Sequence, residues 1–517
     1  MSHRITLRFT GEDRSIHIEC MEGESLLEAM RRQEVPYRAE CGGRGTCGKC
    51  RVRVFSGILK AAAQDMKCFS EAELKQGLRL SCKAYPKEDC TVELFFGYET
   101  AGFDVVTKLT GKPQSEKGRP PIPGNPSYLV AIDLGTTTLA FSLVEEAGCK
   151  VIRTHTAANP QRAYGADVIT RIKSSAEGKQ EALKSVIREE ILRGILTLTK
   201  LEGIEADKIK RIAIAGNTTM GHLFMGYRCD GLGVYPFTPV EIGAIRKRMN
   251  EVFPVPYKTP LVLLPGISAF VGGDITAGLL ACGFDRSEEL CLLVDLGTNG
   301  EMALGSRRSI LVTSAAAGPA FEGGNISCGV GSIPGAISHV TLEEGGYRYE
   351  TIAGKPPIGV CGTGVIEIAS ELLRSGRMDE TGLLADPYFE EGFEIGGMKL
   401  LQRDIRELQL AKAAVRAGIE ILIKRSGISY GDIDKVCLAG GFGYKLDVEK
   451  AIHIGLLPKQ LAGKVEAVGN SSLSGAIRYL TEEDCKERVD RILSVAKEIH
   501  LSNDPGFNDK YIQSMSF

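Results

Sequence analysis

Hydrophobic and polar residues follow two different patterns along this chain. In the first part they alternate in short runs, over residues 5–9 and again over 16–18, which predicts a β-hairpin with one buried face. From residue 128 onward the apolar runs are continuous and end at aspartate or glycine, as in 128–132 and 292–294. Such runs are typical of buried strands in larger sheets. We therefore expect a small domain followed by a larger α/β domain.

Further short elements complete the small domain. Residues 25–30 predict a helix, 52–54 a third strand and 92–94 a closing strand. Ser70, followed by acidic residues, is typical of a capped helix start. Short strands and short helices in this order indicate a compact α+β domain.

Four cysteines give this domain its candidate chemistry: Cys41, Cys47, Cys50 and Cys82. Ferredoxin-type proteins hold an iron–sulfur cluster in this manner, with three thiolates on one loop and one from elsewhere. The loop is rich in glycine, which allows positive φ and lets amide N–H groups point at sulfur. Zinc is the alternative for four thiolates, but structural zinc sites usually pair two short Cys-x2–4-Cys knuckles, and only one occurs here. We predict a [2Fe–2S] cluster on these four residues.

A proline-rich segment separates the two domains. Residues 111–127 hold five prolines and no apolar run, so this stretch cannot bury enough surface to fold and is expected to be extended. The predicted organisation is a cluster domain at 1–98, a linker at 99–127 and a larger domain at 128–517.

Three motifs in the larger domain place a polar loop after a buried strand. Two share the pattern Asp-Leu-Gly-Thr, beginning at Asp133 and Asp295, and the third is the Gly-Gly-Phe-Gly that begins at Gly440. Tight turns present backbone N–H groups and threonine hydroxyls to phosphate oxygens, and glycine allows close approach. Two such loops are suited to hold the phosphates of ATP from both sides, while the glycine loop leaves room for adenosine.

The residue roles follow from these motifs. Asp133 and Asp295 are candidates to hold Mg²⁺ or its water, with Asp274 as a weaker third. An ordinary hairpin turn is the alternative for Asn299 and Gly300, and helix packing or capping is the alternative for Asp274. The residues expected to bind the nucleotide are Gly135, Thr136, Thr137, Thr138, Gly297, Thr298, Asn299, Gly300, Gly440, Gly441 and Gly443.

Two family resemblances rest on these motifs. The first domain resembles the β-grasp ferredoxins, with a five-residue gap between its first two ligands that is closer to oxygenase ferredoxins than to the plant type. Residues 128–480 resemble the acetate and sugar kinase, heat-shock chaperone and actin superfamily, called ASKHA. That resemblance implies two lobes, each built on a mixed sheet with helices, that close over a nucleotide.

Together the parts resemble the reductive activators of corrinoid proteins. Further stretches carry this resemblance: 213–220, 314–324, 359–364, 402–406 and 501–507. It implies ATP-dependent return of a corrinoid protein from inactive Co(II) to Co(I), with the cluster donating one electron. Because the linker runs almost directly into the first ATPase strand, we expect the extra middle domain of some members to be missing.

Two other functions stay open at this point. One is an ATP-driven electron donor to a non-corrinoid enzyme, and the other is a redox-regulated small-molecule kinase. The corrinoid interpretation implies two protein partners: a corrinoid iron–sulfur protein or methyltransferase corrinoid subunit, and an upstream low-potential reductant. The resemblance to the ASKHA superfamily implies that the protein is a homodimer.

Composition sets limits on partners and compartment. The chain has 517 residues and a net charge of −2, which gives no support for binding nucleic acid or anionic membranes. No run of 18 apolar residues occurs, and no signal peptide is evident. Fifteen cysteines without a secretion signal favour a reducing cytoplasm.

Overall fold

The computed structural model describes residues 2–9, 15–33, 35, 37, 43, 45, 48–95, 126–343, 345–440 and 446–517. The predicted linker therefore lies almost entirely outside the described residues. The chain divides into two compact units, each described by itself. The first holds the N-terminal sheet and the segment Ala158–Ile187, and the second holds two larger sheets.

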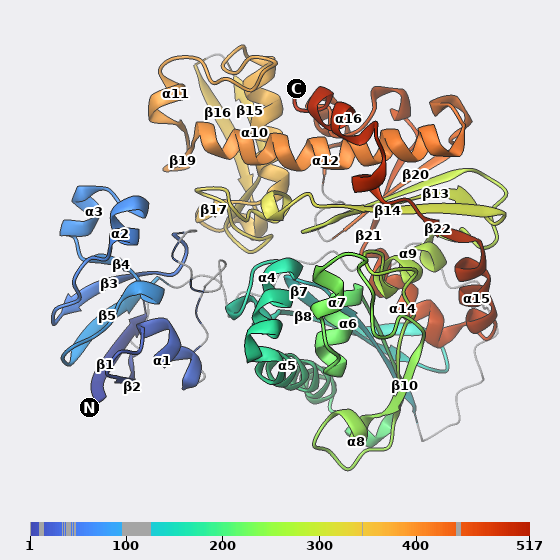
Figure 1. Cartoon of the computed structure of the whole chain (residues 1–517), viewed down its shortest axis with the longest axis horizontal. Coiled ribbons are helices and arrows are strands. Elements are labelled where there is room, and N and C mark those ends of the chain that lie inside the picture. The colour runs from blue at the N-terminus through green and yellow to red at the C-terminus, as the bar shows by residue number, and fades with distance from the viewer. Residues whose placement is uncertain are drawn as a thin grey trace. The chain divides into compact units, whose positions relative to one another are not determined.

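The N-terminal sheet has five strands in the order β2-β1-β5-β3-β4, with β1 parallel to β5 and its other pairs antiparallel. The predicted hairpin, helix and later strands are all present, and the order is that of a β-grasp fold (Figure 1). The elements are β1 Ser2–Phe9, β2 Ser15–Met21, α1 Leu26–Arg32, β3 Arg51–Ser56, α2 Ala63–Cys68, α3 Glu71–Lys75, β4 Leu78–Leu80, η1 Ser81–Lys83 and β5 Cys90–Leu94.

One face of this sheet forms the small core. Ile5, Leu7 and Val92 are fully buried with Leu26 and Met30 of α1, so the period-2 pattern of the strands meets the apolar face of the helix. Packing against this helix gives a small sheet the independent core that strands alone would lack.

The segment Ala158–Ile187 contains η2 Pro160–Ala163, α4 Val168–Ser174, η3 Ser175–Lys179 and the start of α5 Gln180–Leu201. Its Arg171 is fully buried and donates from Nε to the carbonyl of Gly165 at 2.9 Å. This bond ties α4 to the loop that precedes it.

Two six-stranded sheets form the second unit, in the orders β10-β11-β9-β6-β7-β8 and β21-β20-β12-β13-β14-β22. Their strands are β6 Tyr128–Leu134, β7 Thr138–Glu145, β8 Lys150–Ala158, β9 Ile209–Gly216, β10 Ile245–Arg248, β11 Pro260–Leu263, β12 Cys291–Leu296, β13 Gly300–Ser306, β14 Ser309–Ala315, β20 Lys435–Ala439, β21 Val465–Gly469 and β22 Ala496–Glu498.

Both sheets repeat one pairing scheme around the predicted loops. In the first, β6 is antiparallel to β7 and parallel to β9, with Asp133 opposite Ala140. In the second, β12 is antiparallel to β13 and parallel to β20, with Asp295 opposite Glu301. Each aspartate thus stands near the end of the first strand of a hairpin. The two-lobed ASKHA architecture predicted from the sequence is confirmed.

Helices fill the space between the sheets and cover them outside (Figure 1). Buried side chains of α14 and α9 pack on the first sheet, those of α9 and α15 on one face of the second, and those of α12 and α10 on its other face. These helices are α9 Gly273–Cys282, α10 Gly362–Arg374, α12 Gln402–Ser426, α14 Ser471–Thr481 and α15 Cys485–Val495. A further helix of this unit, α6, spans Thr218–Met225.

Smaller elements complete the unit. A three-stranded sheet has the order β16-β15-β17, and β18 pairs with β19. Their bounds, with those of the short helices, are α7 Asp230–Gly233, α8 Met249–Val252, η5 Pro319–Glu322, β15 Ala336–Glu343, β16 Gly346–Thr351, β17 Gly359–Val360, α11 Tyr388–Glu391, β18 Phe393–Ile395, β19 Met398–Leu400, α13 Val448–His453 and α16 Phe507–Gln513.

The two helices between the sheets cross in close contact. An ideal Cβ at Gly475 of α14 would lie 1.9 Å from the carbonyl oxygen of Ala277 in α9, so only glycine fits. Both helices begin at the cavity described below, with Ser471 and Gly273 as their first residues. Their crossing therefore holds together the elements that carry the site.

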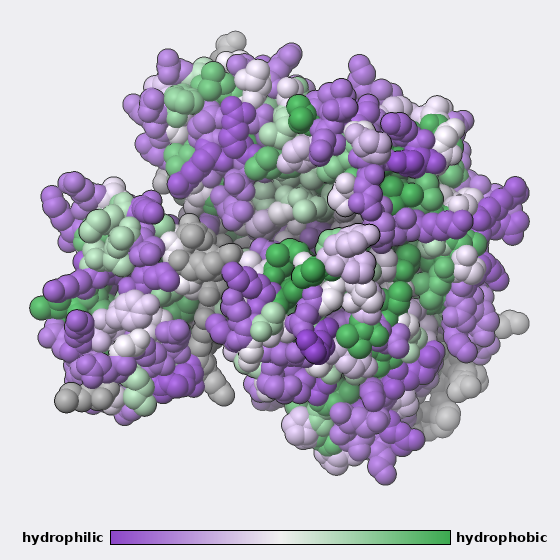
Figure 2. Space-filling model, viewed as in Figure 1, coloured by the Kyte–Doolittle hydropathy of each residue, from purple (hydrophilic) through white to green (hydrophobic). Residues whose placement is uncertain are grey.

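Among the described residues, no helix is long and apolar enough to cross a bilayer. Over those residues, the face drawn in Figure 2 intersperses hydrophilic with hydrophobic side chains.

Candidate functional site

Two of the four predicted cluster ligands lie side by side in the N-terminal unit. Cys50 and Cys82 are 1% and 4% exposed, and their sulfur atoms are 3.3 Å apart. The strand β4 and the turn η1 bring Cys82 to this position. Asp65 of α2 holds the end of β4 in place, because its carboxylate accepts hydrogen bonds from the N–H of Leu80 and of Ala62, each at 2.7 Å.

The loop before Cys50 has the backbone that the glycine content predicted. Gly43, Gly45 and Gly48 have φ of +92°, +81° and +69°, a region that side-chain-bearing residues rarely adopt. Cys41 and Cys47 lie outside the described residues, so their placement stays a prediction. Another cysteine, Cys68, lies near this loop, with its Cβ 3.8 Å from an ideal Cβ at Gly48.

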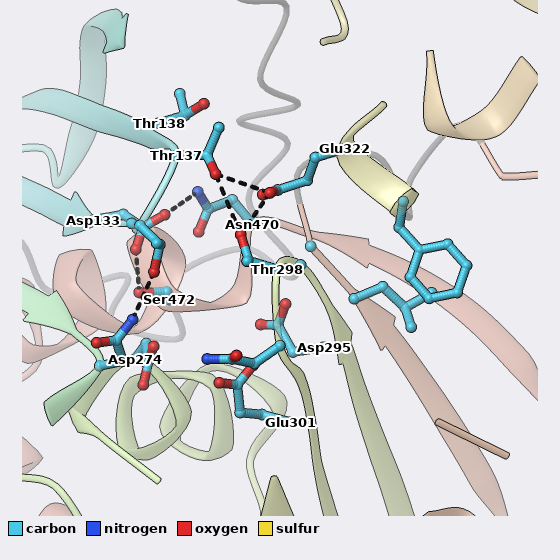
Figure 3. Close-up of a pocket in the computed structure, with 18 of the residues that line it drawn as sticks. Asp133, Thr137, Thr138, Asp274, Asp295, Thr298, Glu301, Glu322, Asn470 and Ser472 are labelled. Atoms are coloured by element: carbon cyan, nitrogen blue, oxygen red, sulfur yellow. Dashed lines mark hydrogen bonds between the residues drawn. The ribbon is translucent and has the colours of Figure 1, made fainter. Parts of the chain in front are cut away.

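The predicted nucleotide residues gather at one cavity between the two larger sheets (Figure 3). Those that line it are Asp133, Gly135, Thr136, Thr137, Thr138, Asp274, Asp295, Gly297, Thr298, Asn299 and Gly440. The first turn, between β6 and β7, and the second, between β12 and β13, thus open on the same space.

Glycine is required at two of these positions for steric reasons. A Cβ at Gly135 would lie 2.4 Å from the carbonyl oxygen of Thr138, across the turn. Gly440 has φ of +111°, and a Cβ there would lie 2.3 Å from the carbonyl oxygen of Leu296. The third motif therefore passes directly against the second strand-loop unit, and only bare backbone allows it.

Four carboxylates share one side of the cavity: Asp133, Asp274, Asp295 and Glu301 (Figure 3). Burial, with repulsion from neighbouring carboxylates, raises the pKa of Asp274 to about 7 and that of Asp295 to about 7. Burial, followed by repulsion from Asp274 and Asp295, raises the pKa of Glu301 well above its usual value. No basic side chain is among the described residues that line the cavity. A divalent cation would neutralise this group.

Asp133 is held by the start of α14. Its two carboxylate oxygens accept hydrogen bonds from Asn470 Nδ2 at 2.8 Å and Ser472 Oγ at 2.7 Å. Burial raises the pKa of Asp133, and these two donors oppose that rise because they favour the charged form. Ser471 Oγ lies 3.3 Å from Asp295 Oδ2, so α14 contacts the aspartates of both motifs.

The first loop has a second support. Asn217, the residue before α6, donates from Nδ2 to Thr136 Oγ1 at 3.0 Å and accepts the N–H of Met220 through Oδ1 at 2.9 Å. It therefore caps the helix and orients the threonine at once.

The sequence analysis did not predict several residues of this site, although each lies in or near a motif that it had singled out. Glu301 directly follows the second motif. Asn217 and Glu322 lie in stretches that carry the family resemblance, and Asn470 and Ser472 follow the glycine motif by about 30 residues. The sequence contained no signal that these stretches meet.

Other predicted residues have mixed outcomes. Asp274 lines the cavity, and its Oδ1 also accepts the N–H of Ile275 at 2.9 Å within the first turn of α9, whose N-cap is Gly272. Its part in holding Mg²⁺ stays a prediction. Gly300 does not line the cavity, and a Cβ there would lie 2.7 Å from Val415 of α12. Gly441 and Gly443 lie outside the described residues.

Family models match almost the whole chain. The model for the 2Fe-2S iron-sulfur cluster binding domain matches residues 9–87. Residues 128–287 match the RACo middle region, and 289–517 match the C-terminal domain of RACo, the ASKHA domain. The match to the middle region begins at the strand that carries the Asp133 motif, in residues that we had assigned to the ATPase domain.

Individual relatives agree with these matches. The corrinoid activation enzyme RamQ of Eubacterium limosum is 30% identical, over 93% of this chain and 94% of the relative. The [Co(II) methylated amine-specific corrinoid protein] reductase of Methanosarcina barkeri is 28% identical, over 75% and 77%. A solved structure, the reductive activator for corrinoid, iron-sulfur protein, has a TM-score of 0.71 and 27% identity, over 99% of this chain and 98% of that one.

Proposed function

Because the chain belongs to the family of RACo-type corrinoid activators, we propose that it returns a corrinoid protein from Co(II) to Co(I) by ATP-dependent electron donation. The observation that carries this proposal is that one chain joins a buried cysteine pair in a ferredoxin fold to two phosphate-type loops that open on one cavity. The first supplies an electron site and the second a nucleotide site.

The cluster is proposed to be of the [2Fe–2S] type, held by Cys41, Cys47, Cys50 and Cys82. The buried sulfurs of Cys50 and Cys82 and the positive φ of Gly43, Gly45 and Gly48 fit such a group, because thiolates and bare backbone surround it. When bound, the cluster supplies one electron at low potential.

ATP with Mg²⁺ is proposed to occupy the cavity. Thr136, Thr137 and Thr298 would bind phosphate oxygens. The four carboxylates described above, Asp295 among them, would hold Mg²⁺ directly or through water. The raised pKa values fit this role, because the carboxylates repel one another until a cation neutralises them.

The reaction needs ATP for a thermodynamic reason. Co(I) is strongly reducing, so electron transfer to Co(II) is uphill, and each ~59 mV of a one-electron gap disfavours the product tenfold. Nucleotide binding that closes two lobes can favour one conformation of the activator and its partner over another, and so offset such a gap.

The partners are proposed to be a corrinoid iron–sulfur protein or a methyltransferase corrinoid subunit, and an upstream low-potential reductant. We further propose a homodimer that works in the cytoplasm. Light scattering of the purified chain tests the subunit count.

Anaerobic spectroscopy of cobalt tests the function. The pre-reduced protein is mixed with a Co(II) corrinoid protein, with and without Mg-ATP, and growth of the Co(I) absorbance is followed. We expect Co(I) only with ATP, and none with Cys50→Ser or Asp295→Asn. Equal Co(I) growth without ATP would overturn the proposal, and Ti(III) citrate as a chemical reductant shows that the corrinoid protein itself is competent.

A further inference from the structure

The fifth carboxylate of the cavity is bound to both phosphate-type loops at once. Glu322 Oε2 accepts a hydrogen bond from Thr137 Oγ1 of the first loop at 2.8 Å and from Thr298 Oγ1 of the second at 2.5 Å (Figure 3). The two hydroxyl oxygens are 3.2 Å from each other. A single oxygen of Glu322 therefore marks the point where the two loops converge.

Glu322 stands apart from the other four carboxylates. Figure 3 shows it beside the two threonines, whereas Asp274, Asp295 and Glu301 form a separate group below. After burial, repulsion from Asp295 raises the pKa of Asp274, and repulsion from both raises that of Glu301, while Asp133 has both oxygens bound by Asn470 and Ser472. The pKa of Asp295 is raised by burial, by repulsion from Asp133 and more weakly by repulsion from Glu322. Glu322 therefore lies with the two threonines, next to the proposed cation site and within electrostatic reach of Asp295.

The backbone around Glu322 is closely packed. It ends η5, and a Cβ at Gly362 of α10 would lie 1.7 Å from the carbonyl oxygen of the preceding Phe321. Gly323 follows with φ of +74°, where a Cβ would lie 2.2 Å from the carbonyl oxygen of Val330. Packing of this kind positions a side chain before any ligand arrives.

The same segment is tied to the start of α12. Ser327 donates from N and Oγ to Asp404 Oδ1, each at 2.8 Å, and Asn325 Nδ2 donates to Glu407 Oε2 at 3.1 Å. These bonds limit how far Glu322 can withdraw from the loops.

The chemistry of the groups says what Glu322 would contact when nucleotide is bound. An ionised carboxylate is an acceptor only and repels phosphate, so it cannot itself bind the terminal phosphate. The threonine hydroxyls rotate and can donate to phosphate oxygens instead. Glu322 Oε2 is then left beside the phosphate with its lone pairs unfilled, and the ligand that satisfies them is a water molecule.

On the premise that ATP occupies this cavity as proposed above, we propose that Glu322 is a catalytic residue, the general base for ATP hydrolysis. Water bound to Glu322 attacks the γ-phosphorus, and the new oxygen–phosphorus bond forms as the bond from phosphorus to the β,γ-bridging oxygen breaks. The water proton passes to Glu322 Oε2, ADP leaves with the bridging oxygen, and Glu322 then releases the proton to solvent. Thr137 and Thr298 then donate to the phosphate, while the close packing of η5 holds the base in place.

Glu322→Gln tests the assignment, because glutamine keeps the shape and the hydrogen-bond acceptor but cannot take the proton. We expect the kcat for ATP hydrolysis to fall by roughly 10²–10⁴, with ATP affinity measured by calorimetry close to wild type. Hydrolysis near the wild-type rate would overturn the proposal, and so would loss of ATP binding, since Glu322 would then serve binding alone. Glu390→Gln, the same change on an exposed carboxylate of α11 that does not line the cavity, is the matched control and should keep its kcat.

Two further measurements separate the possible failures. Should Glu322→Gln melt at a much lower temperature than wild type, Glu322→Asp replaces it, and hydrolysis restored above the glutamine level supports a base. If wild-type protein neither binds nor hydrolyses ATP, the proposed function itself fails. With ATP bound, Glu322→Gln is expected to form Co(I) once per cluster yet not to act on a second corrinoid protein.

Discussion

Ser472 Oγ donates to Asp133 Oδ1 at 2.7 Å, although 339 residues separate the two in the chain. The bond joins the first residues of α14 to the end of β6, and it places a neutral donor on a buried carboxylate. Since α14 also packs against α9, the same helix links the site to the crossing between the sheets.

Removal of that donor is expected to weaken nucleotide binding. Ser472→Ala takes away a hydrogen bond to a charged group, which is worth about 1.5–3 kcal/mol, so affinity for Mg-ATP is expected to fall by roughly tenfold or more. Isothermal titration calorimetry measures the change. Thr481→Ala, at the far end of the same helix, removes a hydroxyl that donates to the carbonyl of Ile477 and should leave the affinity unchanged. Equal losses in both variants would mean that helix stability, not Asp133, is the cause.

The stability of the metal-free protein is expected to fall as pH rises. The pKa values of Asp274 and Asp295 are raised to about 7 in the folded state, from an ordinary value of 3.8, so the folded state holds protons that the unfolded chain has lost. Their stabilising contribution is complete below about pH 4 and is lost as pH rises through about 7. Thermal melts across this range, without and with Mg²⁺, measure it. Mg²⁺ should stabilise more at pH 8 than at pH 6, and Asp274→Asn should flatten the trend. A Mg²⁺ effect independent of pH would contradict this account.

Cluster loading should separate the predicted ligands from a nearby thiol. Cys82→Ser is expected to remove most of the visible absorbance and the electron paramagnetic resonance signal of the reduced cluster, because it withdraws a buried thiolate next to Cys50. Cys68→Ala is the matched control, since Cys68 lies near Gly45 and Gly48 without being a predicted ligand. Loss of the cluster in Cys68→Ala with retention in Cys82→Ser would reverse the assignment.

The helix crossing between the sheets is expected to tolerate no side chain. Gly475→Ala would place a Cβ 1.9 Å from the carbonyl oxygen of Ala277, so α9 and α14 must separate. Overpacking of this kind costs about 1–3 kcal/mol, and the ATPase rate should fall as well because both helices begin at the site. Circular dichroism melts and ATP turnover measure both effects. Gly431→Ala meets only Ser429 Oγ at 3.5 Å and should change neither.

The sequence by itself determined the features that contiguous residues encode. The close spacing of Cys47 and Cys50, the alternation over 5–9 and the Asp-Leu-Gly-Thr turns at Asp133 and Asp295 each lie within a few residues. Local spacing dictates strand, turn and ligand type, so the two phosphate-type loops were predictable from the residues themselves, whereas the β-grasp fold and the two lobes followed from the resemblance to known families.

Only the tertiary structure decided which groups share the cavity. Glu322 meets Thr137 across 185 residues, and Asn470 meets Asp133 across 337, because separate sheets and α14 converge there. Nor does a sequence show that Asp274 and Asp295 titrate near neutrality, since that follows from burial and mutual repulsion that exist only once the chain has folded. Local pattern specifies what each loop is made of, whereas long-range packing specifies what it faces.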